Sequence, residues 1–254
     1  MDLNFAEAYR EHTRHVDGGE IHEGDGFTLL HVPRGEVLHN PIIVHGPVRA
    51  PELLDAARRL AGVRDRRHCV FFREGTNPAL DAALDSAGWR HLFDTPGMAL
   101  AADRWVPRRL DLPDGFSIRP VRSEAEATAY GDLAAEAFAV YGVARDAVRS
   151  FFTRGASLIG AAAQGYLGWI DGAAVTGATL YASHGVAGVG WVGTHPSWFG
   201  RRLAEAVTAE VLRAGFARGL RLANLQASPM GRAVYARMGF EALARYKVFL
   251  PPAT

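Results

Sequence analysis

The sequence predicts an α/β protein with a mixed sheet, in which a smaller N-terminal domain precedes a second domain of the same class. The chain has 254 residues, more than a single domain usually contains. Segments with strand and helix patterns alternate, and Asp171-Gly172 joins two strand patterns as a β-hairpin turn. Residues 104–113 carry two prolines and no periodic pattern, which is typical of a linker. We therefore predict an N-terminal α/β domain over residues 1–110 and a second domain over 111–254.

The N-terminal elements are predicted from apolar spacing and from the glycines and turns that end them. Helices are expected where apolar residues recur at helical spacing, and strands where short apolar runs lie between turn signals. The predicted helices are 3–15, 52–61 (ending at Gly62) and 78–87, and the predicted strands are 27–32, 41–44 and 68–72.

The second domain has clearer patterns. One helix carries an apolar stripe of Leu203, Val207, Val211 and Phe216 and ends at Gly219. The other predicted helices are 124–138, 144–152 and 230–238, and the predicted strands are 116–120, 166–170, 173–182, 186–194, 221–226 and 240–250.

Composition excludes several classes of function. Apolar residues make up 48% and charged residues 22%, so the chain is expected to fold nearly throughout. The formal charge of +1 implies neither nucleic acid nor an anionic membrane as partner. No apolar run approaches the roughly 18 residues of a membrane span, and the N-terminus lacks a signal-peptide pattern.

The few residues suited to redox or metal chemistry predict neither. Cys69 is the only cysteine and lies in an apolar run, so we expect a buried hydrophobe and a cytoplasmic protein. His12, His15 and His22 lack further ligands at metal spacing, so we predict polar surface positions and no metal.

Residues 190–204 have the pattern of a strand, a tight turn and the start of a helix. Such a junction directs unpaired backbone N–H groups and the positive end of the helix dipole at one place, which suits a pyrophosphate. Gly200 would let the anion approach the backbone closely. Many strand-to-helix turns share these properties, so this shape alone assigns no function.

With the run 224–240 added, residues 115–250 resemble the GNAT superfamily of N-acetyltransferases. That family typically has a Val-x-Thr/Val-x-Pro strand end, an Arg-Gly-x-Gly-x-Gly/Ala loop, and a short helix with a tyrosine before Gly-Phe. Order and spacing agree with this pattern. The matching residues are Val192, Pro196, Gly200, Ala204, Asn224, Tyr235, Gly239 and Phe240.

The resemblance implies acetyl-coenzyme A as cosubstrate and no metal. It implies Tyr235 as the acid that protonates the leaving thiolate, and the backbone N–H of Val192, or alternatively Trp191, as donor to the acyl oxygen. The implied cofactor-binding residues are Val192, Gly193, Thr194, Phe199, Gly200, Arg201, Arg202, Leu203, Ala204, Asn224, Ser228 and Tyr235.

The acceptor is less well defined by the sequence. By the family's layout Glu136, Phe138 and Tyr141 would line its pocket, and core packing explains the two aromatic residues equally well. Glu136, His184 and His195 are alternative bases, and water could carry the proton instead. Because no acidic groove for basic peptides is evident, we expect a small-molecule primary amine that attacks the thioester directly.

Two residues depart from the family pattern in the phosphate loop. Phe199 stands where Arg or Gln is usual, and Arg202 where Gly is usual. The Arg202 guanidinium would pair with a phosphate, or its bulk would crowd the site. A noncatalytic acyl-coenzyme A binding module, and an acyltransferase for another acyl-coenzyme A, therefore stay as alternatives.

One sequence pattern of the N-terminal domain is similar to a pattern of the second domain. Leu84 lies four residues before Gly88-Trp89, as Tyr235 lies four residues before Gly239-Phe240. This similarity predicts a degenerate repeat of the same fold, with chance as the alternative. Because nothing over 50–68 resembles a phosphate loop and leucine replaces the tyrosine, we expect this half to be noncatalytic.

Overall fold

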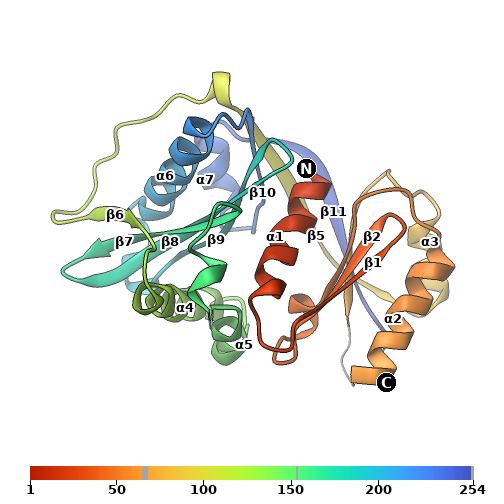
Figure 1. Cartoon of the computed structure of the whole chain (residues 1–254). Coiled ribbons are helices and arrows are strands. Elements are labelled where there is room, and N and C mark those ends of the chain that lie inside the picture. The colour runs from red at the N-terminus through yellow and green to blue at the C-terminus, as the bar shows by residue number, and fades with distance from the viewer. Residues whose placement is uncertain (65–67, 153, 253–254) are drawn as a thin grey trace.

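One mixed sheet runs through the whole molecule, as the computed structural model shows for residues 1–64, 68–152 and 154–252 (Figure 1). The sheet has 11 strands, in the order β1-β2-β3-β4-β11-β5-β10-β9-β8-β7-β6. The strands are β1 Glu20–Gly24, β2 Phe27–His31, β3 Pro41–Val44, β4 Cys69–Arg73, β5 Arg90–Ala101, β6 Ser117–Pro120, β7 Ala163–Ile170, β8 Ala173–Ser183, β9 Val186–Thr194, β10 Leu222–Gln226 and β11 Glu241–Leu250. The helices are α1 Asp2–Arg14, α2 Ala50–Arg64, α3 Leu80–Ser86, α4 Glu124–Ala139, α5 Arg145–Arg149, α6 Leu203–Ala217 and α7 Arg232–Arg237. The predicted mixed α/β class is confirmed.

The sheet consists of two similar halves that exchange their last strands. In the first half β3 and β4 are parallel, and β11 follows β4 in antiparallel orientation. In the second half β9 and β10 are parallel, and β5 follows β10 in antiparallel orientation. Since β5 and β11 also pair with each other, each half receives the final strand of the other. The predicted domains 1–110 and 111–254 are continuous segments of the chain, whereas each half of the sheet contains a strand from the other segment, because β11 lies between β4 and β5.

The two helix–glycine–aromatic units of the predicted repeat have the same geometry. Trp89 N–H donates to Leu84 O at 2.9 Å, and Phe240 N–H donates to Tyr235 O at 3.0 Å. The glycines that precede the two aromatic residues both have positive φ, 78° and 97°. Together with the matching strand order, this supports a repeat rather than chance.

Most predicted elements are present, and the exceptions have local causes. The strands β1 and β5 were not predicted, because β1 is polar and half-exposed at the sheet edge and β5 contains Pro96 and Gly97. The helix α2 continues past Gly62 to Arg64, since an interior glycine costs a helix only about 1 kcal/mol. The helix predicted over 144–152 is α5 followed by a 3-10 turn, Ser150–Phe152.

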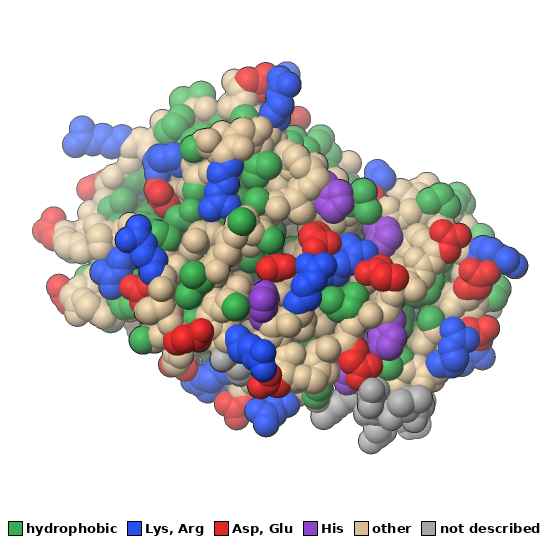
Figure 2. Space-filling model, viewed as in Figure 1, with side chains coloured by type: hydrophobic (Ala, Val, Ile, Leu, Met, Phe, Trp, Pro, Cys, Tyr) green, Lys and Arg blue, Asp and Glu red, His purple; other side chains and the backbone are tan. Residues whose placement is uncertain are grey.

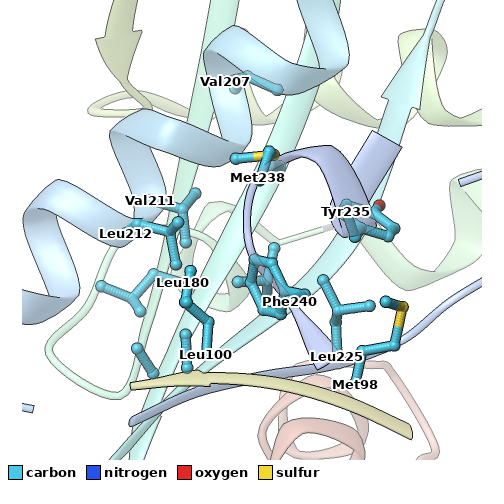
Figure 3. Close-up of a cluster of buried hydrophobic side chains, with 14 of the residues drawn as sticks. Met98, Leu100, Leu180, Val207, Val211, Leu212, Leu225, Tyr235, Met238 and Phe240 are labelled. Atoms are coloured by element: carbon cyan, nitrogen blue, oxygen red, sulfur yellow. The ribbon is translucent and has the colours of Figure 1, made fainter. Parts of the chain in front are cut away.

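Helices cover both faces of the second half of the sheet (Figure 1). On one face α6 and α7 pack on a buried core, which we call the α6 cluster (Figure 3). On the other face α4 and α5 cover a second core, the α4 cluster. The α6 cluster is Met98, Leu100, Tyr166, Ala178, Leu180, Ala187, Val189, Val207, Val211, Leu212, Ala223, Leu225, Ala227, Tyr235, Met238 and Phe240. The α4 cluster is Val32, Val121, Ala127, Tyr130, Leu133, Ala134, Ala135, Val148, Phe151, Phe152, Leu158 and Leu167.

The helix α1 lies between the two halves and contacts both (Figure 1). The Asn4 Nδ2 donates to Tyr181 O at 3.1 Å, on the second half. The Phe5 ring packs against Phe71 and Tyr246, on strands that complete the first half. The prediction of a surface position is wrong for His12, which is 2% exposed beneath this helix. The sequence did not reveal this because α1 is buried against a sheet from the other half.

The structure also bears on the cysteine, on metal binding, on membrane-spanning helices and on surface charge. Cys69 is buried, as predicted, and burial raises the pKa of its thiol. Within 1–64, 68–152 and 154–252, no three His, Cys, Asp or Glu side chains gather as a metal site, and no helix is long and apolar enough to cross a membrane. Positive and negative side chains are interspersed over the face drawn in Figure 2.

Candidate functional site

The second half of the sheet opens between β9 and β10. These strands pair over only three positions, Val186 to Gly188 against Leu222 to Asn224. Beyond them β9 continues to Thr194 along β8, while β10 remains paired with β5. The divergence separates two neighbouring parallel strands at their carboxyl ends, where α/β sheets commonly place their ligands.

A β-bulge lies on β9 at this opening. The register between β8 and β9 shifts between Gly177 and Thr179, opposite an extra residue on β9, and Trp191 has a positive φ of 49°. Beyond the bulge the usual alternation of a strand continues: Trp191 packs on the α4 cluster and the next residue, Val192, on the α6 cluster. Val192 is thus brought to the core that contains Tyr235, as the sequence-based assignment requires.

The loop after β9 uses some of its amides internally and presents the rest at the start of α6. The N–H groups of Trp198 and Phe199 donate to His195 O and Pro196 O, at 2.8 and 3.2 Å. The first intrahelical bond of α6 is Ala206 N–H to Arg202 O, so the amides of the first turn have no acceptor within the helix. Gly200 has a φ of 77°, and no atom lies within 4 Å of where its Cβ would be. This open loop fits a diphosphate.

Arg202 adopts a conformation that explains why glycine is usual there. Its φ is 59°, in the left-handed region, which costs a residue with a side chain roughly 1–2 kcal/mol. Its guanidinium holds the carboxylate of Glu205 with three contacts of 2.8 to 3.1 Å. The Glu205 side chain is only 3% exposed, whereas that of Arg202 is 36% exposed. The guanidinium therefore neutralises a carboxylate in the first turn of α6, an arrangement that neither sequence-based alternative considered.

Tyr235 lies on α7 with its ring buried beside Phe240, at a centroid distance of 5.9 Å. In Figure 3 its hydroxyl points away from Phe240, Leu225 and Met98. Burial raises the pKa of this hydroxyl above its usual value of 10.0, so it keeps its proton at neutral pH. A protonated phenol at the margin of an apolar core can act as an acid.

A contact across the opening joins Tyr141 to Ser228. The Tyr141 hydroxyl, beyond the end of α4, donates to Ser228 Oγ at 3.0 Å, and Ser228 Oγ also accepts from Gly231 N–H at 3.1 Å. Gly231 packs against the Tyr235 ring, since a Cβ there would lie 2.8 Å from Cε2 of Tyr235. Tyr141, which was predicted to line the acceptor pocket, therefore lies near Ser228 and Tyr235, which were predicted to bind the cofactor.

Two of the three candidate bases, Glu136 and His195, are engaged in other contacts. Arg145 donates two hydrogen bonds to the Glu136 carboxylate, at 2.8 and 3.0 Å, and thereby lowers its pKa. The Nδ1 of His195 accepts from Ser197 N–H at 3.3 Å. His184 lies in the β8–β9 turn with a positive φ of 52°. Glu136 is consequently a weaker base than a free carboxylate, and solvent is the simplest proton acceptor.

The remaining predicted residues surround these groups. Phe138 packs against Trp191 at a ring distance of 5.2 Å, on the α4 side. Asn224 also faces α1, because its amide donates to Met1 O at 3.3 Å. Phe199 is exposed, and the Arg201 guanidinium lies over the Trp198 ring at 4.7 Å. Of three further predicted residues, Gly193 packs against Ala137 of α4, and Leu203 and Ala204 begin α6.

The equivalent loop of the first half lies between β3 and α2, at 45–49. There the N–H groups of His45 and Gly46 donate to Gly26 O, at 2.9 and 3.0 Å, and Val48 N–H donates to Asn77 Oδ1 at 3.0 Å. Pro47 has no N–H. These internal bonds leave that loop poorly suited to bind an anion, which supports the expectation of a noncatalytic first half.

Sequence reasoning missed Glu205 and the buried polar residues around the bulge. Glu205 is the third residue of α6. A carboxylate there interacts favourably with the helix dipole in any helix, so it does not indicate a functional site. Tyr130, Thr179 and Tyr181 are polar residues within apolar patterns. Only their burial together reveals a network.

Comparisons with known proteins agree with this architecture. No protein-family model matches the sequence, and no curated protein matches it. The structure is similar to a GCN5-related N-acetyltransferase from Kribbella flavida, with 21% identity, a TM-score of 0.73, and coverage of 99% of this chain and 95% of that chain. A tandem GNAT protein from the clavulanic acid biosynthesis pathway is similar at 22% identity and a TM-score of 0.60, covering 90% and 79%. A GCN5-related N-acetyltransferase from Sphaerobacter thermophilus is similar at 19% identity and a TM-score of 0.57, covering 91% and 82%. The chain therefore has the fold of the GCN5-related N-acetyltransferases.

Proposed function

We propose that this protein transfers an acetyl group from acetyl-coenzyme A to the primary amine of a small molecule. The observation that carries the proposal is the opening between β9 and β10, with an amide-rich helix start at one end and Tyr235 beside it. The fold likeness supports acyl transfer, and the resemblance of the loop and of α7 supports a coenzyme A thioester.

In this proposal each group has a defined task. The amides of 200–205 bind the diphosphate, and the Val192 N–H donates to the thioester oxygen as negative charge develops there. The amine nitrogen forms the new C–N bond while the C–S bond breaks. Tyr235 gives its proton to the leaving sulfur and is reprotonated from solvent, and the attacking nitrogen loses its extra proton to water as the amide forms. Direct attack is favoured because, in the part of the chain that the structure describes, no nucleophile with an adjacent base lies at the opening.

The preference for a small acceptor rests on the mouth of the opening. The Tyr141–Ser228 hydrogen bond spans it, and Phe138 and Trp191 pack beside it. An acidic groove of about 500 Å³ does exist between β1, β2 and α2, lined by Glu20, Glu23, Asp25 and Glu52 among others. It belongs to the first half of the sheet, away from β9, and therefore offers no obvious place for a basic peptide to reach the thioester.

A noncatalytic acyl-coenzyme A binding role is the second candidate. The Arg202–Glu205 pair favours it, because a carboxylate in the first turn of α6 weakens the attraction for a diphosphate if the pair opens. An acyltransferase that uses a different acyl-coenzyme A is a third candidate.

The decisive experiment follows thiol release from acetyl-coenzyme A over a broad panel of small primary amines. The proposal expects amine-dependent thiol release with at least one acceptor, together with the N-acetylated product by mass spectrometry. Binding of acetyl-coenzyme A without turnover over the panel would favour the binding module. Turnover only with other acyl thioesters would show that the transferred acyl group is not acetyl.

A further inference from the structure

A chain of buried polar side chains connects α1 of the first half to the bulge on β9. The Tyr130 hydroxyl donates to Trp191 O at 3.0 Å and shares a hydrogen bond with Thr179 Oγ1 at 2.9 Å. Tyr181 lies two residues further along the same strand, and its hydroxyl is hydrogen bonded to Nε2 of His12. These buried side chains thus form a row along β8 that reaches from one half of the molecule to the backbone of the other.

The Trp191 carbonyl determines the direction of the hydrogen bonds at the bulge. A carbonyl only accepts, so Tyr130 donates to Trp191 O and its oxygen accepts the proton of Thr179. The Tyr181 oxygen shares a separate hydrogen bond with Nε2 of His12. Burial lowers the pKa of His12 to about 3, so the imidazole is neutral at pH 7 and carries one ring proton.

The surrounding packing is shaped to hold this chain in place. All four side chains are at most 3% exposed. Added Cβ atoms would lie 3.1 Å from the Tyr130 ring at Gly177 and 2.7 Å from the Tyr181 ring at Gly190, so both glycines leave room for these rings. Close packing on all sides restricts these side chains to one arrangement.

The Trp191 carbonyl, which accepts the hydrogen bond from Tyr130, is adjacent to the Val192 N–H of the proposed reaction. Trp191 carries the positive φ that forms the bulge, and the peptide bond that begins at its carbonyl ends at the N–H of Val192. Because a peptide group is planar, holding the carbonyl also fixes the direction of that N–H. The Trp191 ring is held as well, between His12, Phe138 and Phe152, at 5.1 to 5.6 Å.

We propose that His12, Tyr181, Thr179 and Tyr130 are positioning residues that aim the Val192 N–H at the acyl oxygen, so that the noncatalytic half contributes to the active site of the other half. This inference rests on the proposed function. It assigns α1 a role besides joining the halves: the first half orients a catalytic amide that it does not itself carry.

The test uses matched pairs that remove or retain one hydrogen-bonding group. Thr179→Val and His12→Leu remove the group, while Thr179→Ser and His12→Gln retain a hydroxyl and an N–H donor. We expect kcat to fall about tenfold or more in the first two variants, because misdirection of a catalytic donor lowers transition-state stabilisation. The KM for acetyl-coenzyme A and the Kd for coenzyme A, which lacks the acyl oxygen, should change by less than about twofold. The Ser and Gln variants should recover most of the activity.

A control separates positioning from stability. Tyr246→Phe removes another buried tyrosine hydroxyl that bonds to α1, at Asp2, without touching the bulge. We expect it to lower Tm and leave kcat unchanged. The amide resonance of Val192, in protein labelled with ¹⁵N-valine and free of ligand, should shift in Thr179→Val and His12→Leu and not in Tyr246→Phe.

Wild-type kcat in Thr179→Val and His12→Leu, or a kcat that follows Tm in all variants, would overturn the inference while leaving the proposed function intact. A wild-type protein that binds no acyl thioester would contradict the proposed function, and the Val192 resonance would still decide whether the chain orients that amide. An unshifted resonance would overturn the inference in that case as well.

Discussion

Tyr235→Phe is expected to lower kcat by about two orders of magnitude while leaving the Kd for acetyl-coenzyme A nearly unchanged. General acid catalysis contributes roughly 10²- to 10⁴-fold, and the phenylalanine ring keeps the packing against Phe240. Steady-state kinetics and calorimetric titration of both proteins measure the two effects. Because burial raises the pKa of Tyr235 above 10.0, its protonated form persists, and kcat should show no decline from this group as pH rises from 7 to about 10.

The matched control is Tyr166→Phe. Tyr166 is a buried tyrosine of the same α6 cluster, on β7, whose hydroxyl has no task in the proposed reaction. We expect it to retain wild-type kcat. If Tyr235→Phe also retained wild-type kcat, Tyr235 would be a packing residue and another group would have to protonate the sulfur.

Arg202→Gly is expected to weaken the binding of coenzyme A by about 1 to 3 kcal/mol, although glycine is the residue usual at this position. Glycine relieves the left-handed strain of residue 202 but leaves the Glu205 carboxylate unpaired beside the diphosphate. The loss of charge compensation outweighs the relief. Calorimetric titration with coenzyme A and with dephospho-coenzyme A should show the same loss for both, because the diphosphate is common to them.

A double-variant cycle isolates the pair. Glu205→Gln should restore binding to Arg202→Gly, and alone it should tighten binding, because the guanidinium is then free to face the phosphates. Tighter binding by Arg202→Gly itself would show that the side chain crowds the site. Equal affinities in all four proteins would mean that the pair has no part in binding.

The parts of the fold that depend on local patterns were predictable. The apolar stripe from Leu203 to Phe216 defined α6, and Asp171-Gly172 defined the β7–β8 hairpin. The loop at Gly200 was indicated by a pattern set within one strand–helix unit, whereas the tyrosine of α7 was assigned through the resemblance to the GNAT superfamily. Such units are held by contacts close in sequence.

The features that depend on distant contacts were not predictable. The exchange of β5 and β11 pairs Arg90–Ala101 with Glu241–Leu250, and no local pattern distinguishes this pairing from two separate sheets. His12 was assigned to the surface because its contact with Tyr181 spans 169 positions of sequence. The pairing of Arg202 with Glu205 is local, yet the near-complete burial of Glu205 is a property of the packed core.

We propose that the second-half opening, and not its counterpart in the first half, binds a coenzyme A thioester. Titration of uniformly ¹⁵N-labelled protein with acetyl-coenzyme A, followed by amide resonances, tests it most directly. We expect saturable shifts for Val192 and for 200–205, with the amides of His45, Gly46 and Val48 unchanged because their acceptors lie within the protein. No shifts at millimolar ligand, or shifts centred on 45–49, would contradict the account.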